Sequence, residues 1–298
     1  MDSDNALVLE GGGFRGMFTA GVLDVLMEHN VYDFSSVWGV SAGALNAFSF
    51  KSRQIGRTMR IMLAFRDDRR FMSFWSLATT GNIAGGEFLY DEVQNRLDPG
   101  DNTTFNNNPL RMYAVASDLV FGTAAYLPCE EFPRDVDKVR ASASLPLLSR
   151  VVEIDGHRYL DGGTTDSIPF EVALGINDAP QVEGYAPARR ALVVVTQDRT
   201  YEKSAAQGAL AVRSRRYSDY PYYEEALATR YLRYNAKRER LFKLEASEKS
   251  PVIVIAPEKP VEVGTNEHSG GKLLDLYLQG RNQAVRRLDE IKSFLAGE

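Results

Sequence analysis

The chain has 298 residues, of which 44% are hydrophobic and 25% are charged, and its formal net charge is −5 at pH 7. These proportions are typical of an ordinary folded domain, and they exclude a disordered chain, a collagen-like repeat and a coiled coil. The negative charge argues against nucleic acid as a partner. The lone Cys129 excludes an internal disulfide, and the three histidines lack metal-site spacing, so no metal is expected.

The N-terminus lacks the features of a targeting segment. The first five residues carry Asp2 and Asp4 in place of positive charge, and no apolar run reaches the length of a membrane span. We therefore expect a soluble cytoplasmic protein.

The start of the chain alternates short apolar runs with glycine turns and helical patterns. A strand is predicted over residues 6–9, followed by a glycine loop over 10–16 and a helix over 17–28. A second strand lies within 31–40, and a helix rich in small residues follows it. This order of elements is typical of the opening of a parallel α/β sheet.

The remainder of the chain also alternates predicted helices and strands. Residues 53–98 are mostly helical and aromatic in pattern, and helices are predicted over about 205–246 and 271–295. Further strands are predicted over 111–117, 121–128, 191–196 and 252–256, together with a hairpin over 151–160 that turns at Asp155-Gly156. With no repeat or linker between these elements, the simplest prediction is one domain spanning residues 1–298.

One serine lies in a pattern typical of nucleophiles. Gly39-Val40-Ser41-Ala42-Gly43 matches G-x-S-x-G between a predicted strand and a predicted helix. A serine at such a sharp turn projects its hydroxyl, and glycines tolerate the crowded backbone on either side. The following helix N-terminus favours developing negative charge. The alternative is a tight turn that packs a small-residue helix against the sheet.

A glycine-rich loop follows the first predicted strand. Within Glu10-Gly11-Gly12-Gly13-Phe14-Arg15-Gly16, successive glycines leave backbone N–H groups free to converge on an anion, as in an oxyanion hole. Gly11, Gly13 and Gly16 also fit a dinucleotide-binding spacing, but the acidic partner is missing because Asp33 precedes the second strand. A phosphate-binding P-loop is excluded, since no Lys-Ser or Lys-Thr pair follows.

The base that would activate Ser41 is sought among histidines and aspartates. Asp161-Gly162-Gly163 presents a carboxylate at a turn, although a structural capping aspartate is the alternative. His29 ends the first helix and His157 lies in the hairpin turn. His268 has the chain order of a hydrolase triad, but too few strands precede Ser41 for that fold. The remaining candidate for the base is Asp161, which would act on Ser41 directly without a histidine.

These motifs resemble the bacterial branch of the patatin-like phospholipase family. The similarity covers residues of about 7–170 and comprises, in family order, the glycine loop 11–16, the turn 39–43, the stretch Ala141-Ser142-Ala143-Ser144-Leu145-Pro146 and Asp161-Gly162-Gly163. Many members carry Asp where this chain has Glu10, so a carboxylate is retained. The region after Ala205 carries no motif that can be transferred.

The resemblance implies a three-layer α/β/α fold with a mostly parallel central sheet and a lipid acyl hydrolase that needs no cofactor. Ser41 would attack the ester and Asp161 would accept its proton. The residues implied around this pair are Gly11, Gly12, Gly13, Phe14, Arg15 and Gly16 for the oxyanion hole, Gly39 and Gly43 for the turn, and Gly162 and Gly163 for the base loop. A phospholipid or related lipid ester is expected as substrate; the alternatives are small soluble esters or thioesters, and a non-enzymatic lipid-binding role.

Two segments combine cations with aromatic residues. Residues 57–75 predict a helix pair with a buried aromatic face and a solvated arginine face, with a mobile cover or interfacial patch as the alternative. Residues 230–243 carry six cations against Glu239, which predicts a solvated helix face or, alternatively, a membrane-surface helix. Peripheral contact with the inner membrane surface therefore stays open, and the oligomeric state is not predicted.

Overall fold

The computed structural model describes residues 4–265 and 267–298. Its centre is an eight-stranded sheet with the order β5-β6-β3-β2-β1-β7-β8, and β4 pairs with β3 beside this path. The strands are β1 (Asn5–Leu9), β2 (Ser36–Val40), β3 (Arg111–Asp118), β4 (Ala124–Cys129), β5 (Val152–Ile154), β6 (His157–Asp161), β7 (Arg190–Val194) and β8 (Val252–Ile255). β1, β2, β3, β7 and β8 run parallel, which confirms the mostly parallel sheet. β4 and β6 run antiparallel to β3, and β5 runs antiparallel to β6.

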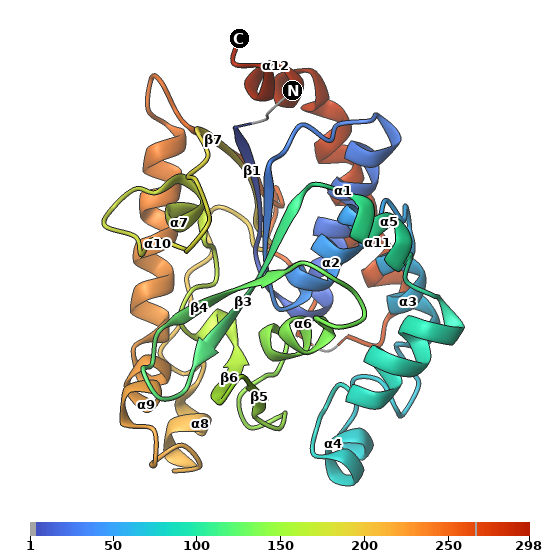
Figure 1. Ribbon diagram of the computed structural model, residues 1–298, viewed down its shortest axis with the longest axis vertical. Helices are drawn as coiled ribbons and strands as arrows, with labels where there is room; N and C mark the ends of the chain where they lie inside the picture. The colour runs from blue at the N-terminus through green and yellow to red at the C-terminus, as the bar shows by residue number, and fades with distance from the viewer. Residues whose placement is uncertain (1–3, 266) are drawn as a thin grey trace.

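Both faces of the sheet are covered by helices (Figure 1). Leu7 and Leu9 of β1 belong to the core on one face, while Ala6 and Val8 belong to the core on the other, as the strand period of two requires. The first face is covered by α1 (Gly16–Glu28), α2 (Ala42–Lys51), α3 (Arg57–Phe65), α5 (Asn102–Asn107), α6 (Val136–Ser142), α11 (Gly270–Arg286) and α12 (Leu288–Ala296), and the second by α7 (Phe170–Leu174) and α10 (Arg230–Glu245). The result is the predicted three-layer α/β/α fold.

The helical predictions for the second half were too long. The segment 205–246 contains α8 (Ala209–Arg213), α9 (Pro221–Ala228) and α10. Pro221 starts α9 at its first turn, and Thr229, with a φ of −100° and a ψ of 4°, separates α9 from α10. The segment 271–295 is divided into α11 and α12 at Arg287, whose φ of −106° and ψ of 13° leave the helical region. Apolar periodicity continues across such a break and does not reveal it.

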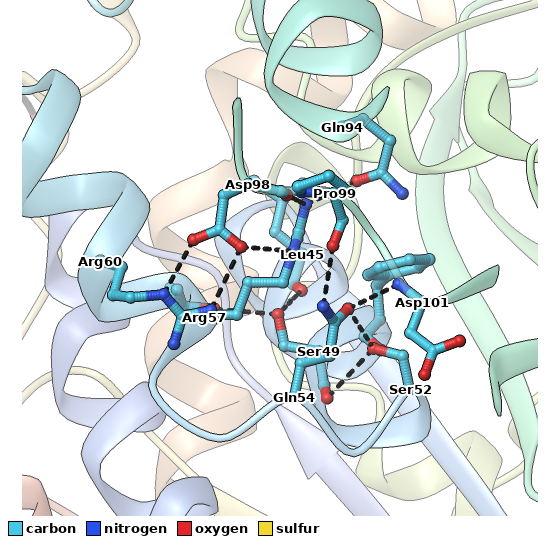
Figure 2. A network of polar contacts seen from close by, with 12 residues as sticks. Leu45, Ser49, Ser52, Gln54, Arg57, Arg60, Gln94, Asp98, Pro99 and Asp101 are labelled. Atoms are coloured by element: carbon cyan, nitrogen blue, oxygen red, sulfur yellow. Dashed lines mark hydrogen bonds and ion pairs between the residues drawn. The ribbon is translucent and has the colours of Figure 1, made fainter. Parts of the chain in front are cut away.

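The segment 57–75 also differs from its prediction. Phe74 and Trp75 begin α4 (Phe74–Thr80), a short helix that projects from the body, and they are exposed instead of buried (Figure 1). Arg57 is buried instead of solvated, and its guanidinium donates to Gln94 of the π-helix η2 (Phe88–Leu97) at 2.8 Å (Figure 2). Among the helices of the described residues, none combines the length and the apolar character that a bilayer span requires.

Candidate active site

The sheet register brings Ser41 and Asp161 together. β2 runs parallel to β3 and ends at Val40, opposite Val115, so Ser41 comes directly after the paired residues. β6 runs antiparallel to β3 and ends at Asp161, which is opposite the next residue of β3, Ala116. β4 pairs with one edge of β3, so β2 and β6 both pair with the opposite edge, one after the other along β3. Because β2 and β6 run in opposite directions, their last residues face each other. The nucleophile candidate and the carboxylate therefore meet across one end of the sheet.

Ser41 occupies a strained turn. Its φ of 55° and ψ of −122° lie in a region that side chains other than glycine rarely adopt. The turn is tightly packed, since a Cβ at Gly39 would lie 2.6 Å from the backbone of Ala44 and one at Gly43 would lie 2.4 Å from the Leu9 carbonyl. This is the close backbone approach for which the sequence predicts glycine at both positions.

The small-residue stretch at the end of α6 contacts both functional candidates. The Ser41 N–H donates to the Ser142 hydroxyl at 2.9 Å, and that hydroxyl donates to the Val115 carbonyl at 2.6 Å. The Asp161 N–H donates to the Ser144 carbonyl at 2.7 Å. The resemblance marked this stretch as a family motif without giving it a role. In the structure it fixes the backbone of Ser41 and Asp161 relative to each other.

Asp161 is a buried carboxylate with a free oxygen. Its side chain is 3% exposed, and Oδ1 accepts a hydrogen bond from the Gly163 N–H at 2.7 Å. Oδ2 makes no hydrogen bond of ordinary length and angle to the described residues. Burial raises the pKa of Asp161 above its ordinary value, and the facing Ser41 hydroxyl opposes this effect. A raised pKa improves a carboxylate as a base near neutral pH.

The glycine loop presents unused donors beside Ser41. The N–H groups of Gly12 and Gly13 donate to none of the described residues, whereas the Phe14 N–H donates to the Thr265 carbonyl at 3.2 Å. Gly13 has a φ of 58°, which favours glycine. The loop is anchored by Glu10, which is buried and accepts a hydrogen bond from the Thr196 N–H at 2.6 Å.

These groups line one cavity of about 360 Å³. Its lining residues are Glu10, Gly11, Gly12, Gly13, Arg15, Ser41, Leu145, Asp161, Gly163, Ser167, Gln197, Tyr201, Lys203, Gln207, Arg230, Tyr234 and Thr265. Of the implied site residues, Phe14 instead packs edge-on against Phe71, Gly16 begins α1, and Gly162 lies against the Val115 carbonyl. The volume lies within the range common for small-ligand sites.

An apolar pocket begins on the other side of Ser41. It consists of a space of about 50 Å³ and an adjoining space of about 40 Å³. Both spaces are lined by Leu45, Met62, Phe71, Leu89 and Tyr90. The first also touches Ser41, and the second ends at Arg57 and Gln94, which belong to the polar network in Figure 2. Ser41 thus lies at the boundary between a polar cavity and an apolar one.

The histidines lie away from this cavity. His157 is the first residue of β6, is half-exposed and contacts Asp118 at 3.0 Å. The exposed side chain of His268 contacts Asp67 at 3.3 Å, just before α11. His29 ends α1. In the described residues, no histidine lines the cavity that contains Ser41.

Sequence reasoning missed the part of the cavity that the second half of the chain supplies. Lys203 lies in the loop after β7, and Arg230 and Tyr234 come from α10. Arg230 lies in the basic run that the sequence revealed, but no pattern indicated which of its cations faces Ser41. Lys203 has no flanking motif at all.

Comparison with known families gives two matches. Residues 7–174 match the family described as patatin-like phospholipase. Residues 220–296 match a domain of unknown function, DUF6363. The second match contains α10 and α11, and it therefore covers Arg230 and Tyr234 of the cavity.

Individual relatives match the first half. An uncharacterised Escherichia coli protein, YjjU, is 32% identical over 173 residues, which are 56% of this chain and 48% of that protein. An uncharacterised NTE family protein of Mycobacterium tuberculosis, Rv1063c, is 29% identical over 182 residues, or 58% of this chain and 46% of the relative. Mouse Pnpla3, named a 1-acylglycerol-3-phosphate O-acyltransferase, is 28% identical over 172 residues, or 55% of this chain and 40% of the relative. The chain thus spans about half the length of these relatives or less.

Proposed function

The chain belongs to the patatin-like phospholipase family, and we propose that it is a serine acyl hydrolase that cleaves carboxylic esters of phospholipids or related lipids. The observation that carries the proposal is the placement of Ser41, on a strained turn, against a buried carboxylate in one cavity. The lipid chemistry in the family's name and in that of mouse Pnpla3 supports the substrate class.

The cavity residues have distinct roles in the proposed reaction. Ser41 Oγ attacks the ester carbonyl carbon while its proton passes to Asp161, and the unused N–H groups of Gly12 and Gly13 stabilise the oxyanion. The ester C–O bond then breaks, and the leaving alcohol takes the proton from Asp161. A water molecule next attacks the acyl-enzyme and gives its proton to Asp161. When the fatty acid leaves, Ser41 regains that proton.

The apolar pocket supports a lipid in preference to a small soluble ester. It opens at Ser41 and is lined almost entirely by hydrophobic side chains, so an acyl chain bound there is removed from water. A small soluble ester or thioester would leave this pocket unfilled and would gain nothing from it. The pocket therefore favours the acyl side of the substrate, and the polar cavity favours the alcohol side.

The test is covalent labelling with a fluorophosphonate, which reacts with activated serines without requiring a known substrate. We expect one adduct per chain, mapped to Ser41 by peptide mass analysis, no adduct in Ser41→Ala, and strongly slowed labelling in Asp161→Asn. His268→Ala is the control and should be labelled at the wild-type rate, because His268 lies outside the cavity. Absence of an adduct in folded wild-type protein, or an adduct on another residue, would overturn the proposal.

A further inference from the structure

Three cations from distant parts of the chain face the cavity that contains Ser41. Arg15 belongs to the glycine loop, Lys203 to the loop after β7 and Arg230 to the start of α10. Lys203 is 9% exposed, so it is a buried cation at a position that no sequence motif indicates. Buried lysines are rare in proteins unless their charge has a partner.

In the described residues these cations are not in ion-pair contact with a carboxylate, although Glu10 and Asp161 attract Lys203 from further away. Within residues 4–265 and 267–298, no ion pair joins Arg15, Lys203 or Arg230 to an acidic side chain, and the Lys203 ammonium makes no hydrogen bond; it lies 3.8 Å from the centre of the Tyr234 ring. The Arg230 Nε donates to the Gly163 carbonyl at 2.6 Å, which leaves the rest of its guanidinium without a charged partner.

The two carboxylates of the cavity accept hydrogen bonds from neutral groups. Both oxygens of Glu10 accept hydrogen bonds, one from the Thr196 N–H at 2.6 Å and one from the Tyr234 hydroxyl at 2.5 Å. Asp161 faces Ser41 and Gly163. The cavity therefore combines three cationic side chains with two carboxylates whose hydrogen bonds go to neutral groups, so the cations outnumber the carboxylates by one.

Other cations of α10 show the contrast. Lys237 forms ion pairs with Asp166 at 2.6 Å and with Glu171 at 3.2 Å, and Arg240 pairs with Glu171 at 2.7 Å. Within α10, Lys237 and Arg240 are thus paired with acidic side chains, whereas Arg230, which faces the cavity, is not. The prediction that 230–243 is a solvated face is wrong for Lys237, whose side chain is largely buried in ion pairs with Asp166 and with Glu171 of α7, whereas Arg240 stays exposed as predicted.

We propose that Lys203 and Arg230, together with Arg15, form a subsite for a phosphate group carried by the substrate, so that the preferred ester is a glycerophospholipid or lysophospholipid instead of a neutral glyceride. This inference rests on the proposed function, since it names the substrate of the same cavity. Ammonium and guanidinium groups form strong charge-assisted hydrogen bonds to phosphate. Burial and the two arginines lower the pKa of Lys203, whereas Glu10 and Asp161 act in the opposite direction, and a bound anion would add to the effect of these carboxylates.

The first experiment compares two esters that differ only by the phosphate: 1-decanoylglycerol 3-phosphate and 1-decanoylglycerol, each below its aggregation concentration. We expect wild type to favour the phosphate ester in kcat/KM. In Lys203→Met and in Arg230→Gln, the ratio of the two kcat/KM values should fall about tenfold or more, as the loss of charged hydrogen bonds predicts. Lys243→Met, which removes an exposed cation of the same helix, is the matched control and should keep the wild-type ratio.

A second experiment measures binding without hydrolysis. Glycerol 3-phosphate should raise the Tm of wild type and of Lys243→Met, whereas glycerol should not, and the rise should disappear in Lys203→Met and in Arg230→Gln. If wild type hydrolyses neither ester but still shows this selective rise, the proposed function fails and the phosphate subsite stands.

Three results would overturn the subsite. The first is an equal fall of both kcat/KM values in the two variants, which would give the cations a general role in the geometry of the site. The second is hydrolysis by wild type without preference for the phosphate ester. The third is a Tm rise with inorganic phosphate but not with glycerol 3-phosphate, which would assign the cations to a free anion and not to a lipid headgroup.

Discussion

The Ser142 hydroxyl accepts a hydrogen bond from the backbone N–H of Ser41 at 2.9 Å. The same hydroxyl donates to the Val115 carbonyl of β3 at 2.6 Å, so it connects the turn after β2 to the neighbouring strand. Ser41 has a strained backbone, and such a conformation persists only when its surroundings hold it. Ser142 is one of the groups that hold it.

We therefore expect Ser142→Ala to lower both activity and stability. The substitution leaves the buried Ser41 N–H and Val115 carbonyl without partners, which costs about 1–3 kcal/mol per group. The serine would also be held less firmly in line with the ester, so kcat should fall about tenfold or more while KM changes little. Steady-state kinetics and thermal melts of the purified variant measure both effects.

Ser144→Ala is the matched control for that variant. The Ser144 hydroxyl donates to the Arg140 carbonyl of α6, and the contact between the Ser144 carbonyl and the Asp161 N–H survives the substitution. Its kcat should stay near wild type. Equal losses in the two variants would show that the stretch acts through general packing and not through the Ser142 hydroxyl.

The pH dependence of hydrolysis should report Asp161. Burial raises the pKa of this carboxyl above its ordinary value of 3.8, and the base must be ionised to accept a proton from Ser41. The kcat/KM should therefore fall as the pH drops through the raised pKa, with an acidic limb above 3.8. A profile that stays flat down to the ordinary aspartate range would contradict a buried Asp161 as the base.

Stability gives an independent check on the same carboxyl. Because the pKa is higher in the folded state, the stabilising contribution of Asp161 is complete below the unfolded-state pKa and is lost as the pH rises through the folded-state pKa. Asn at this position keeps an oxygen for the Gly163 N–H and carries no charge. The Tm of Asp161→Asn, relative to wild type, should thus rise between acidic and neutral pH.

The sequence was sufficient to predict the candidate site residues that lie at the ends of strands. Ser41 follows a recognisable strand and precedes a small-residue helix, and Asp161 is the last residue of a strand and precedes two glycines. These local signals can be read without knowledge of the sheet order. The family resemblance and the mostly parallel three-layer fold are confirmed for the same reason, since they depend on the order of local motifs.

The sequence was not sufficient to predict the cavity residues whose position depends on the order of the strands in the sheet. Lys203 enters the same cavity as Ser41 because β7 pairs with β1, although the paired residues Asn5 and Arg190 lie 185 positions apart in the chain. No periodicity in the chain encodes that pairing. Arg230 depends further on the break at Thr229, whose φ of −100° and ψ of 4° separate α9 from α10.

The apolar pocket predicts a limit on acyl length. It runs from Ser41 to the buried side chains of Arg57 and Gln94, and burial lowers the pKa of Arg57 to about 10 without removing its charge at neutral pH. An acyl chain long enough to reach this polar end would bury no further apolar surface with additional methylenes. Leu89 lines both spaces, so Leu89→Trp should fill the pocket and shift the preference toward shorter acyl chains.

The measurement is the ratio of kcat/KM for decanoyl and butyryl esters of one alcohol. Each buried methylene contributes about 0.8 kcal/mol, so excluding two or more from the pocket should lower this ratio about tenfold in Leu89→Trp. Leu97→Trp, an exposed position on the same π-helix, adds the same side chain outside the pocket and should leave the ratio unchanged. If both variants kept the wild-type ratio, the acyl chain would have to lie elsewhere, and the polar cavity beside Ser41 would then be the place to look for it.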